Sequence, residues 1–241
     1  MTYSESKSTW YEEIFTHSLK ALFSHIKKSA SSLIFPAFCM HCASALSDNE
    51  TTLCIGCTQA LELLDPKRRC SSCFCRTQTR HKARCSACRK KKEKPRCLAG
   101  CFDLLSPMKS VIHAFQSGQS PFFARGLAAY ALVQLDQLQW PAVECVTYVP
   151  QAALQRMLTG YDPARLIAEE LAGALKCPIQ CLLTKEYMGI CKARYVPTQK
   201  VQNASPKSCL LLSCTGGEAP DSAAACLQKH ISSVYTLVLM P

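Results

Sequence analysis

The stretches CMHCASALSDNETTLCIGC at 39–57 and CSSCFCRTQTRHKARCSAC at 70–88 decide the fold of the N-terminal part of this chain. Both have the spacing Cys-x2-Cys-x11-Cys-x2-Cys, and each cysteine of the second frame follows its counterpart in the first by 31 residues. A gap of two residues lets both thiolates of a pair face one metal ion, and two pairs complete the tetrahedral four-sulfur shell that Zn2+ accepts. The spacing predicts two structural zinc sites, one formed by Cys39, Cys42, Cys54 and Cys57 and one by Cys70, Cys73, Cys85 and Cys88.

A disulfide framework is the alternative interpretation of these cysteines, and it requires an oxidising compartment. The first ten residues are polar and lack the charged start, apolar segment and small-residue cleavage site of a secretory signal. No run of about 18 apolar residues marks a membrane span. The sequence therefore predicts a cytoplasmic protein with reduced thiols. Because a closed four-sulfur site has no open coordination position, the two zinc ions are expected to stabilise the fold rather than to catalyse.

Positive charge is concentrated around the second frame. The chain has a formal net charge of +11, and the stretch 66–96 contains thirteen Lys or Arg residues and a single acid, Glu93. Such a cluster neutralises phosphates and releases counterions, which predicts nucleic-acid binding. The alternative is a solvated loop that only improves solubility. The predicted nucleic-acid-binding residues form the densest part of the cluster, namely Arg89, Lys90, Lys91, Lys92, Lys94 and Arg96.

Three ranges are expected along the chain. Residues 1–34 are expected to form an amphipathic helix, because apolar side chains recur at helical spacing at Phe15, Leu19, Leu22 and Ile26. This helix either packs on its own domain or binds a membrane surface or a partner. Residues 35–96 are expected to form the double zinc ribbon with its basic patch, and residues 97–241 an α/β domain.

The expected α/β domain shows strands alternating with helices. Helices are predicted at 107–115, 122–138, 163–175 and 220–230, and strands at 143–149, 179–183, 208–213 and 234–239. This order predicts a mainly parallel sheet with both faces covered. Ligands of such sheets bind at the carboxyl ends of the strands, so the loop after Ser213 is the place to look for a site.

Several short stretches resemble the ComF family of competence-associated proteins, which join a zinc ribbon to a domain like the type I phosphoribosyltransferases. The Leu-Ile-Phe-Pro stretch at 33–36 resembles the lead-in to the family's first cysteine pair. Three further stretches resemble family motifs, namely Val-Ile-His-Ala-Phe at 111–115, Val-Pro at 149–150 and Gly-Tyr-Asp at 160–162. The resemblance covers residues 33–239. It implies a phosphoribosyltransferase-like α/β domain and a role in the uptake or processing of single-stranded DNA, together with a competence helicase or recombination proteins.

The sequence departs from this family where a phosphoribosyltransferase has its two adjacent acids and its Thr-Thr-Gly phosphate loop. The acid positions are occupied by Ser213 and Cys214, and the loop continues with Thr215, Gly216 and Gly217. Neutral side chains are weaker acceptors than carboxylates for the ribose hydroxyls of phosphoribosyl pyrophosphate. Residues 213–217 are therefore expected either to keep a phosphate-binding loop without chemistry or to form only a tight turn. No catalytic residue and no Mg2+ are expected. Cys214, like the other cysteines of the apolar segments, is expected to be a small buried hydrophobe. The alternative is a reactive thiol, because a helix N-terminus beside Cys214 would lower its pKa.

Three functions follow from these features. The first is a ComF-like protein that handles single-stranded DNA through its basic zinc module, with a catalytically decayed phosphoribosyltransferase-like domain. The second is an active phosphoribosyltransferase of nucleotide metabolism, which the missing acids argue against. The third is a protein-interaction scaffold in which the basic patch binds no nucleic acid.

Overall fold

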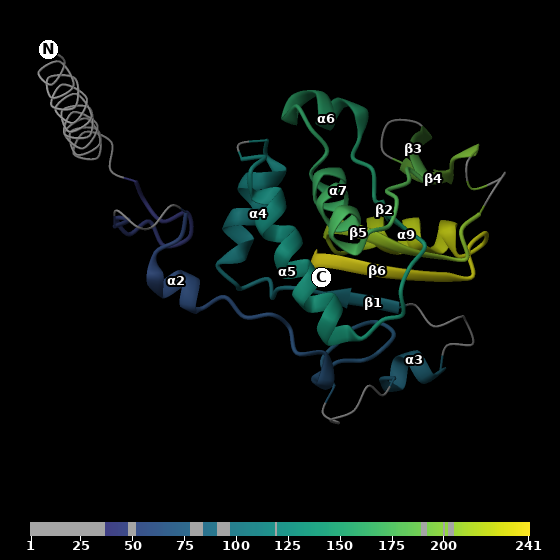
Figure 1. Ribbon diagram of the computed structural model, residues 1–241, viewed down its shortest axis with the longest axis horizontal. Helices are drawn as coiled ribbons and strands as arrows, with labels where there is room; N and C mark the ends of the chain where they lie inside the picture. The colour runs from purple at the N-terminus through teal and green to yellow at the C-terminus, as the bar shows by residue number, and fades with distance from the viewer. Residues whose placement is uncertain are drawn as a thin grey trace, which may run out of the picture. The chain divides into compact units, whose positions relative to one another are not determined.

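The structure is a computed structural model (Figure 1), and it describes residues 37–47, 52–77, 84–90, 97–118, 120–188, 192–199, 201 and 205–241. The expected N-terminal helix at 1–34 lies outside these residues, as do the basic segments 78–83 and 91–96. Contacts divide the chain into two compact units, Met1–Gln59 and Ala60–Pro241. The first unit contains the first cysteine frame. The second unit contains the second frame together with the α/β sheet. The boundary between the units therefore lies after Gln59, whereas the sequence placed both frames in one range, 35–96.

In the parts that the structure describes, the two cysteine modules, 37–59 and 68–90, have the same local backbone structure at the 31-residue offset. Each begins with an antiparallel bridge, Phe38 to Ala45 in the first and Arg69 to Arg76 in the second. Each ends in a five-residue helix, α2 (Ile55–Gln59) or α3 (Ser86–Lys90). The turn after the second cysteine contains a left-handed residue in both, with φ 58° at Ala43 and 59° at Phe74. The repeat of the cysteines is therefore also a repeat of the backbone.

The sheet of the second unit contains four strands in the order β1-β6-β5-β2. All three strand pairs are parallel. The strands are β1 (Cys97–Gly100), β6 (Ser233–Met240), β5 (Ser208–Thr215) and β2 (Cys145–Tyr148). Beyond β2, a single parallel bridge joins Val146 to Ile179. The mainly parallel α/β sheet that the sequence predicts is confirmed. A likeness to the phosphoribosyltransferase fold itself stays a prediction.

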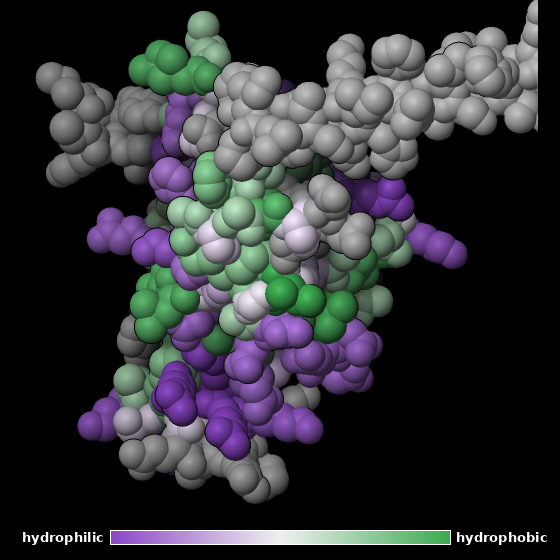
Figure 2. Space-filling view, turned by 90° about the vertical axis from the view of Figure 1, so that its left-hand side faces the viewer, coloured by the Kyte–Doolittle hydropathy of each residue, from purple (hydrophilic) through white to green (hydrophobic). Residues whose placement is uncertain are grey.

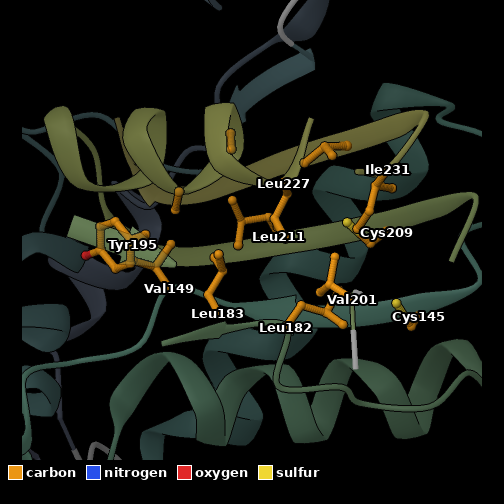
Figure 3. Packing of buried hydrophobic residues seen from close by; sticks show 13 residues of the cluster. Cys145, Val149, Leu182, Leu183, Tyr195, Val201, Cys209, Leu211, Leu227 and Ile231 are labelled. Atoms are coloured by element: carbon orange, nitrogen blue, oxygen red, sulfur yellow. The ribbon is translucent and has the colours of Figure 1, made fainter. Parts of the chain in front are cut away.

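Helices cover both faces of this sheet. Helix α9 (Glu218–Leu227) lies on one face, and α5 (Phe123–Leu138) and α7 (Pro163–Leu175) lie on the other (Figures 1 and 3). On the α9 face, Leu211 of β5 and Leu227 of α9 are fully buried at the centre of the core cluster (Figure 3). Their neighbours on β5, Leu210 and Leu212, are also buried, because successive side chains of a strand point to opposite faces. Covered faces explain why β5 is apolar almost throughout.

The predicted helices at 107–115, 122–138, 163–175 and 220–230 correspond to α4 (Met108–Gln116), α5, α7 and α9. Helix α7 begins as Asp162-Pro163 predicts, because the Asp162 carboxylate accepts a hydrogen bond from the backbone N–H of Arg165 at 3.3 Å. The predicted strand at 179–183 is reduced to the bridge at Ile179. Leu183 instead begins an antiparallel hairpin, β3 (Leu183–Met188) with β4 (Lys192–Pro197).

In the described part of 97–241, the predicted elements do not include β1, the β3–β4 hairpin or the short helix α6 (Ala153–Thr159). Among the described residues, no helix is both long enough and apolar enough to cross a membrane.

Candidate metal centres and the sheet edge

The first cysteine set is arranged as the spacing predicts. The four Sγ atoms of Cys39, Cys42, Cys54 and Cys57 all lie within 4.8 Å of one another. The Sγ atoms of Cys42 and Cys54, which belong to different pairs, are 3.6 Å apart. A tetrahedral zinc site with Zn–S bonds of about 2.3 Å requires sulfur–sulfur separations of about 3.8 Å. The four thiols therefore fit a structural zinc ion, which would hold the two pairs together.

The second set also fits a zinc ion, but it contains a thiol that the spacing did not predict. The four Sγ atoms that all lie within 4.8 Å of one another belong to Cys70, Cys73, Cys75 and Cys85. The Sγ atoms of Cys73 and Cys85 are 3.8 Å apart, which again matches a tetrahedral four-sulfur shell. Cys88, the predicted fourth ligand, is next to this group, because its backbone N–H donates to the Cys85 sulfur at 3.4 Å.

Backbone N–H groups surround one sulfur in each module. The Cys70 sulfur accepts hydrogen bonds from the backbone N–H of Cys85 at 3.2 Å and of Ser72 at 3.4 Å. Burial of Cys70 opposes the thiolate, but backbone donors outweigh this effect and lower the pKa of Cys70 to about 6. The corresponding donors do the same at Cys39, where burial is again outweighed and the pKa falls to about 6. Hydrogen bonds lower the pKa of Cys54 and Cys85 as well, so each module favours the thiolate form that a metal binds.

The second module is fixed to the edge of the sheet. The backbone N–H of Leu98 in β1 donates to the Ser72 carbonyl at 3.2 Å, and that of Leu64 donates to the Cys101 carbonyl at 2.9 Å. The fully buried Gln134 of α5 donates to the carbonyls of Leu64 and Gly100, both at 2.9 Å. These bonds provide partners for backbone N–H and C=O groups of β1. They also shield an edge strand whose unpaired groups could otherwise pair with another chain.

The described part of the second module is strongly basic. Residues 66–77 and 84–90 contain no acid. Two of the predicted nucleic-acid-binding residues, Arg89 and Lys90, are exposed on α3, and the other four, Lys91, Lys92, Lys94 and Arg96, lie outside the described residues. The same module contains five further cations that were not predicted to bind, namely Lys67, Arg68, Arg69, Arg76 and Arg84. Hydrophilic side chains gather over the lower part of the face shown in Figure 2.

The loop after β5 is tightly packed. Ser213 and Cys214 are both buried, and the Ser213 hydroxyl donates to the Thr215 carbonyl at 2.7 Å. Cys214 is buried, as expected of a small hydrophobic side chain, and burial raises the pKa of its thiol, which argues against the alternative of a reactive cysteine. A Cβ on Gly216 would lie 2.7 Å from the carbonyl carbon of Pro241, and Gly217 has φ +99°. Packing and turn geometry thus account for both glycines. Phosphate binding by residues 213–217 stays a prediction.

Gly216→Ala is expected to lower the thermal unfolding temperature, because the new methyl group would meet backbone atoms of Pro241 that cannot rotate away. Overpacking of this kind costs about 1–3 kcal/mol. Gly173→Ala is the matched control, since a Cβ on Gly173 of α7 has open space around it. That replacement is expected to stabilise by about 0.5–1 kcal/mol. Thermal unfolding of both variants distinguishes them, and a neutral effect at Gly216 would contradict the close packing of this turn.

Comparisons of this chain with protein-family models, with curated proteins and with solved structures find no match.

Proposed function

We propose that the protein binds single-stranded nucleic acid through the second cysteine module and acts in the uptake or processing of single-stranded DNA, as its resemblance to the ComF family implies. The observation that supports this most directly is the charge of the module. Its described residues 66–77 and 84–90 contain seven Lys or Arg side chains and no acid. Four thiolates and one zinc ion add two negative charges, which leaves the module with an excess of positive charge.

The attachment of the module to β1 supports the same proposal. The hydrogen bond from Leu98 to Ser72 joins the module to β1, and the bond from Leu64 to Cys101 fixes the segment just before the module at the end of the same strand. A cationic surface whose positions are fixed loses less conformational entropy when it binds a phosphate backbone. The α/β unit is then a scaffold that holds the module, and the competence helicase or recombination proteins remain its proposed partners.

Binding is expected to be independent of base sequence and to weaken steeply with salt, since each neutralised phosphate of a single strand contributes about −0.7 to the slope of log K against log salt. The variant Arg89→Glu/Lys90→Glu removes two exposed cations of α3 and is expected to flatten this slope by about 1.4. Fluorescence titration of a labelled single-stranded oligonucleotide at several salt concentrations measures both quantities.

Lys176→Glu/Lys229→Glu is the control for this experiment, because it changes the net charge equally at two exposed lysines of the α/β unit. If both double variants change the slope equally, binding follows overall charge and not the module. If neither changes affinity or slope, the basic patch only improves solubility and the chain is better described as a protein-interaction scaffold.

A further inference from the structure

We propose that the second metal centre is a five-thiol site, in which Cys75 and Cys88 alternate as the fourth zinc ligand. This inference rests on the assignment of the cysteine sets as zinc sites and not on nucleic-acid binding. A tetrahedral zinc ion accepts four thiolates, and the cluster offers five within reach. Cys70, Cys73 and Cys85 provide the three constant ligands. The fourth position can then be filled from either of two places in the chain.

The position of Cys75 favours a ligand role on geometric grounds. Its Sγ atom lies within 4.8 Å of the Sγ atoms of all three constant ligands. The Sγ atom of Cys88 does not lie within this distance of the whole group. Cys75 is exposed, and its backbone carbonyl accepts a hydrogen bond from the N–H of Cys70 at 2.9 Å. That bond closes the turn of the first pair and holds Cys75 beside the cluster.

The first module provides an internal comparison. The residue that corresponds to Cys75 at the 31-residue offset is Ser44. Its hydroxyl lies 3.0 Å from the Cys42 sulfur, so this position faces the cluster in both modules. The corresponding carbonyl of Ser44 accepts from the N–H of Cys39 at 2.8 Å. Zinc in structural sites is held by thiolate and imidazole rather than by hydroxyl groups. Among the described residues, a fifth thiol therefore lies beside the cluster of the second module and not beside that of the first.

Cys88 remains a ligand candidate because it is placed like its counterpart Cys57. Both follow the third cysteine by three residues in a five-residue helix, and Cys88 stays bonded to Cys85 through its N–H at 3.4 Å. The thiol of Cys88 also interacts with those of Cys73 and Cys85. Neither Cys75 nor Cys88 is buried, so both have access to solvent protons.

Exchange between the two ligands is chemically balanced. As the Cys75 thiolate leaves zinc and takes up a proton, the Cys88 thiol loses a proton and binds as thiolate. The number of Zn–S bonds and the charge of the site are unchanged, and no oxidant or reductant is required. The second site is therefore expected to survive the loss of either thiol, whereas the described part of the first module offers no further thiol in place of Cys57.

The test compares four variants of the full chain: Cys75→Ser, Cys88→Ser, the double variant, and Cys57→Ser as the matched control in the first module. Zinc is counted per chain, and the cobalt-substituted proteins are compared by the intensity of the thiolate-to-cobalt charge-transfer band. The band reports the number of thiolates bound, even where a water molecule or serine completes the site of a variant.

Both single variants of the second module are expected to keep two metal ions and the wild-type band. The double variant and Cys57→Ser are each expected either to lose a metal ion or to lose the part of the charge-transfer intensity that one bound thiolate contributes. A loss in Cys88→Ser but not in Cys75→Ser would assign Cys88 as the fixed ligand and overturn the proposal. The reverse pattern would fix Cys75 and overturn it equally. Fewer than two zinc ions in the wild-type chain would contradict the zinc assignment itself, whatever the result of the nucleic-acid titrations.

Discussion

Replacing Cys70 with serine is expected to destabilise the α/β unit, whereas the corresponding Cys39→Ser replacement is expected to leave the unfolding of that unit unchanged. Binding of a structural zinc ion contributes on the order of 10–16 kcal/mol, and this free energy is available only to the folded module. Loss of one of four thiolates removes most of it locally. The two replacements differ because Cys39 and Cys70 belong to different compact units.

The effect of Cys70→Ser is expected to spread through the contacts between its module and the sheet. When the module unfolds, β1 loses the hydrogen bond from Leu98 to Ser72, and the sheet edge loses the shielding that the module gives it. Each such hydrogen bond contributes about 1 kcal/mol, and burial of Phe74, 4% exposed in the folded protein, adds about 1.5–3 kcal/mol. For a unit of this size, a loss of about 2.5–4 kcal/mol lowers Tm by roughly 5–16 °C.

Thermal unfolding followed by helical circular dichroism measures this effect. Among the described residues, most of the helical signal comes from the α/β unit, because α2 and α3 of the cysteine modules are only five residues long. Zinc determination on both variants must show one ion lost from each. Equal Tm values for Cys39→Ser and Cys70→Ser would mean that the second module is no more coupled to the sheet than the first.

No measurable binding of phosphoribosyl pyrophosphate is expected, although the resemblance to the ComF family suggests a phosphoribosyltransferase-like domain. The two positions that carry acids in that enzyme class are Ser213 and Cys214, and both are buried at the end of β5. Losing two charge-assisted hydrogen bonds of about 1.5–3 kcal/mol each weakens binding by roughly two to four powers of ten. A fold shared with an enzyme does not by itself supply these groups.

Isothermal titration with phosphoribosyl pyrophosphate and Mg2+ measures this affinity, and a pyrophosphate-release assay measures transfer. Micromolar affinity in the wild-type chain would show that other residues hold the ribose. The control is the Ser213→Asp/Cys214→Asp variant. Cys214 lies close enough to Asp162 for their charges to interact. New carboxylates at positions 213 and 214 would be buried, and at 214 also near the Asp162 carboxylate, so they are expected to lower the free energy of unfolding. A gain of affinity in this variant would identify the carboxyl end of β5 as a decayed binding site for phosphoribosyl pyrophosphate.

The sequence alone predicted the features that depend on spacing and local chemistry. The two cysteine frames, the helix start at Asp162 and the alternation of strands and helices all follow from short-range patterns. A Cys-x2-Cys pair constrains its own turn, and an Asp-Pro pair constrains its own helix start. Both patterns act within a few residues. This is why α4, α5, α7 and α9 agree with the predicted helices to within a few residues.

Cys75 was not predicted as a ligand, because the ligands were assigned from cysteines that recur at the 31-residue offset. The residue that corresponds to Cys75 in the first frame is Ser44. The sequence does contain a signal for an additional ligand, because Cys75 is only two residues from Cys73. Only the folded turn, with its left-handed Phe74, shows that this third thiol returns to the cluster. Distances among five sulfur atoms from two separate segments are a property of the tertiary structure.

Burial and attachment were likewise decided by the tertiary structure. From sequence, a helix start beside Cys214 left a reactive thiol as an alternative, and packing, which buries this thiol and raises its pKa, decides against it. The basic module looked like part of a separate ribbon domain, yet Ser72 of the module bonds to Leu98 of β1, and Gln134 bonds to Leu64, just before the module, and to Gly100. Sequence determined which residues bind metal in pairs and which segments form strands and helices, because those choices are local. Which thiols share one site, and which surface supports the cations, depends on contacts between segments far apart in the chain, and local patterns do not specify such contacts.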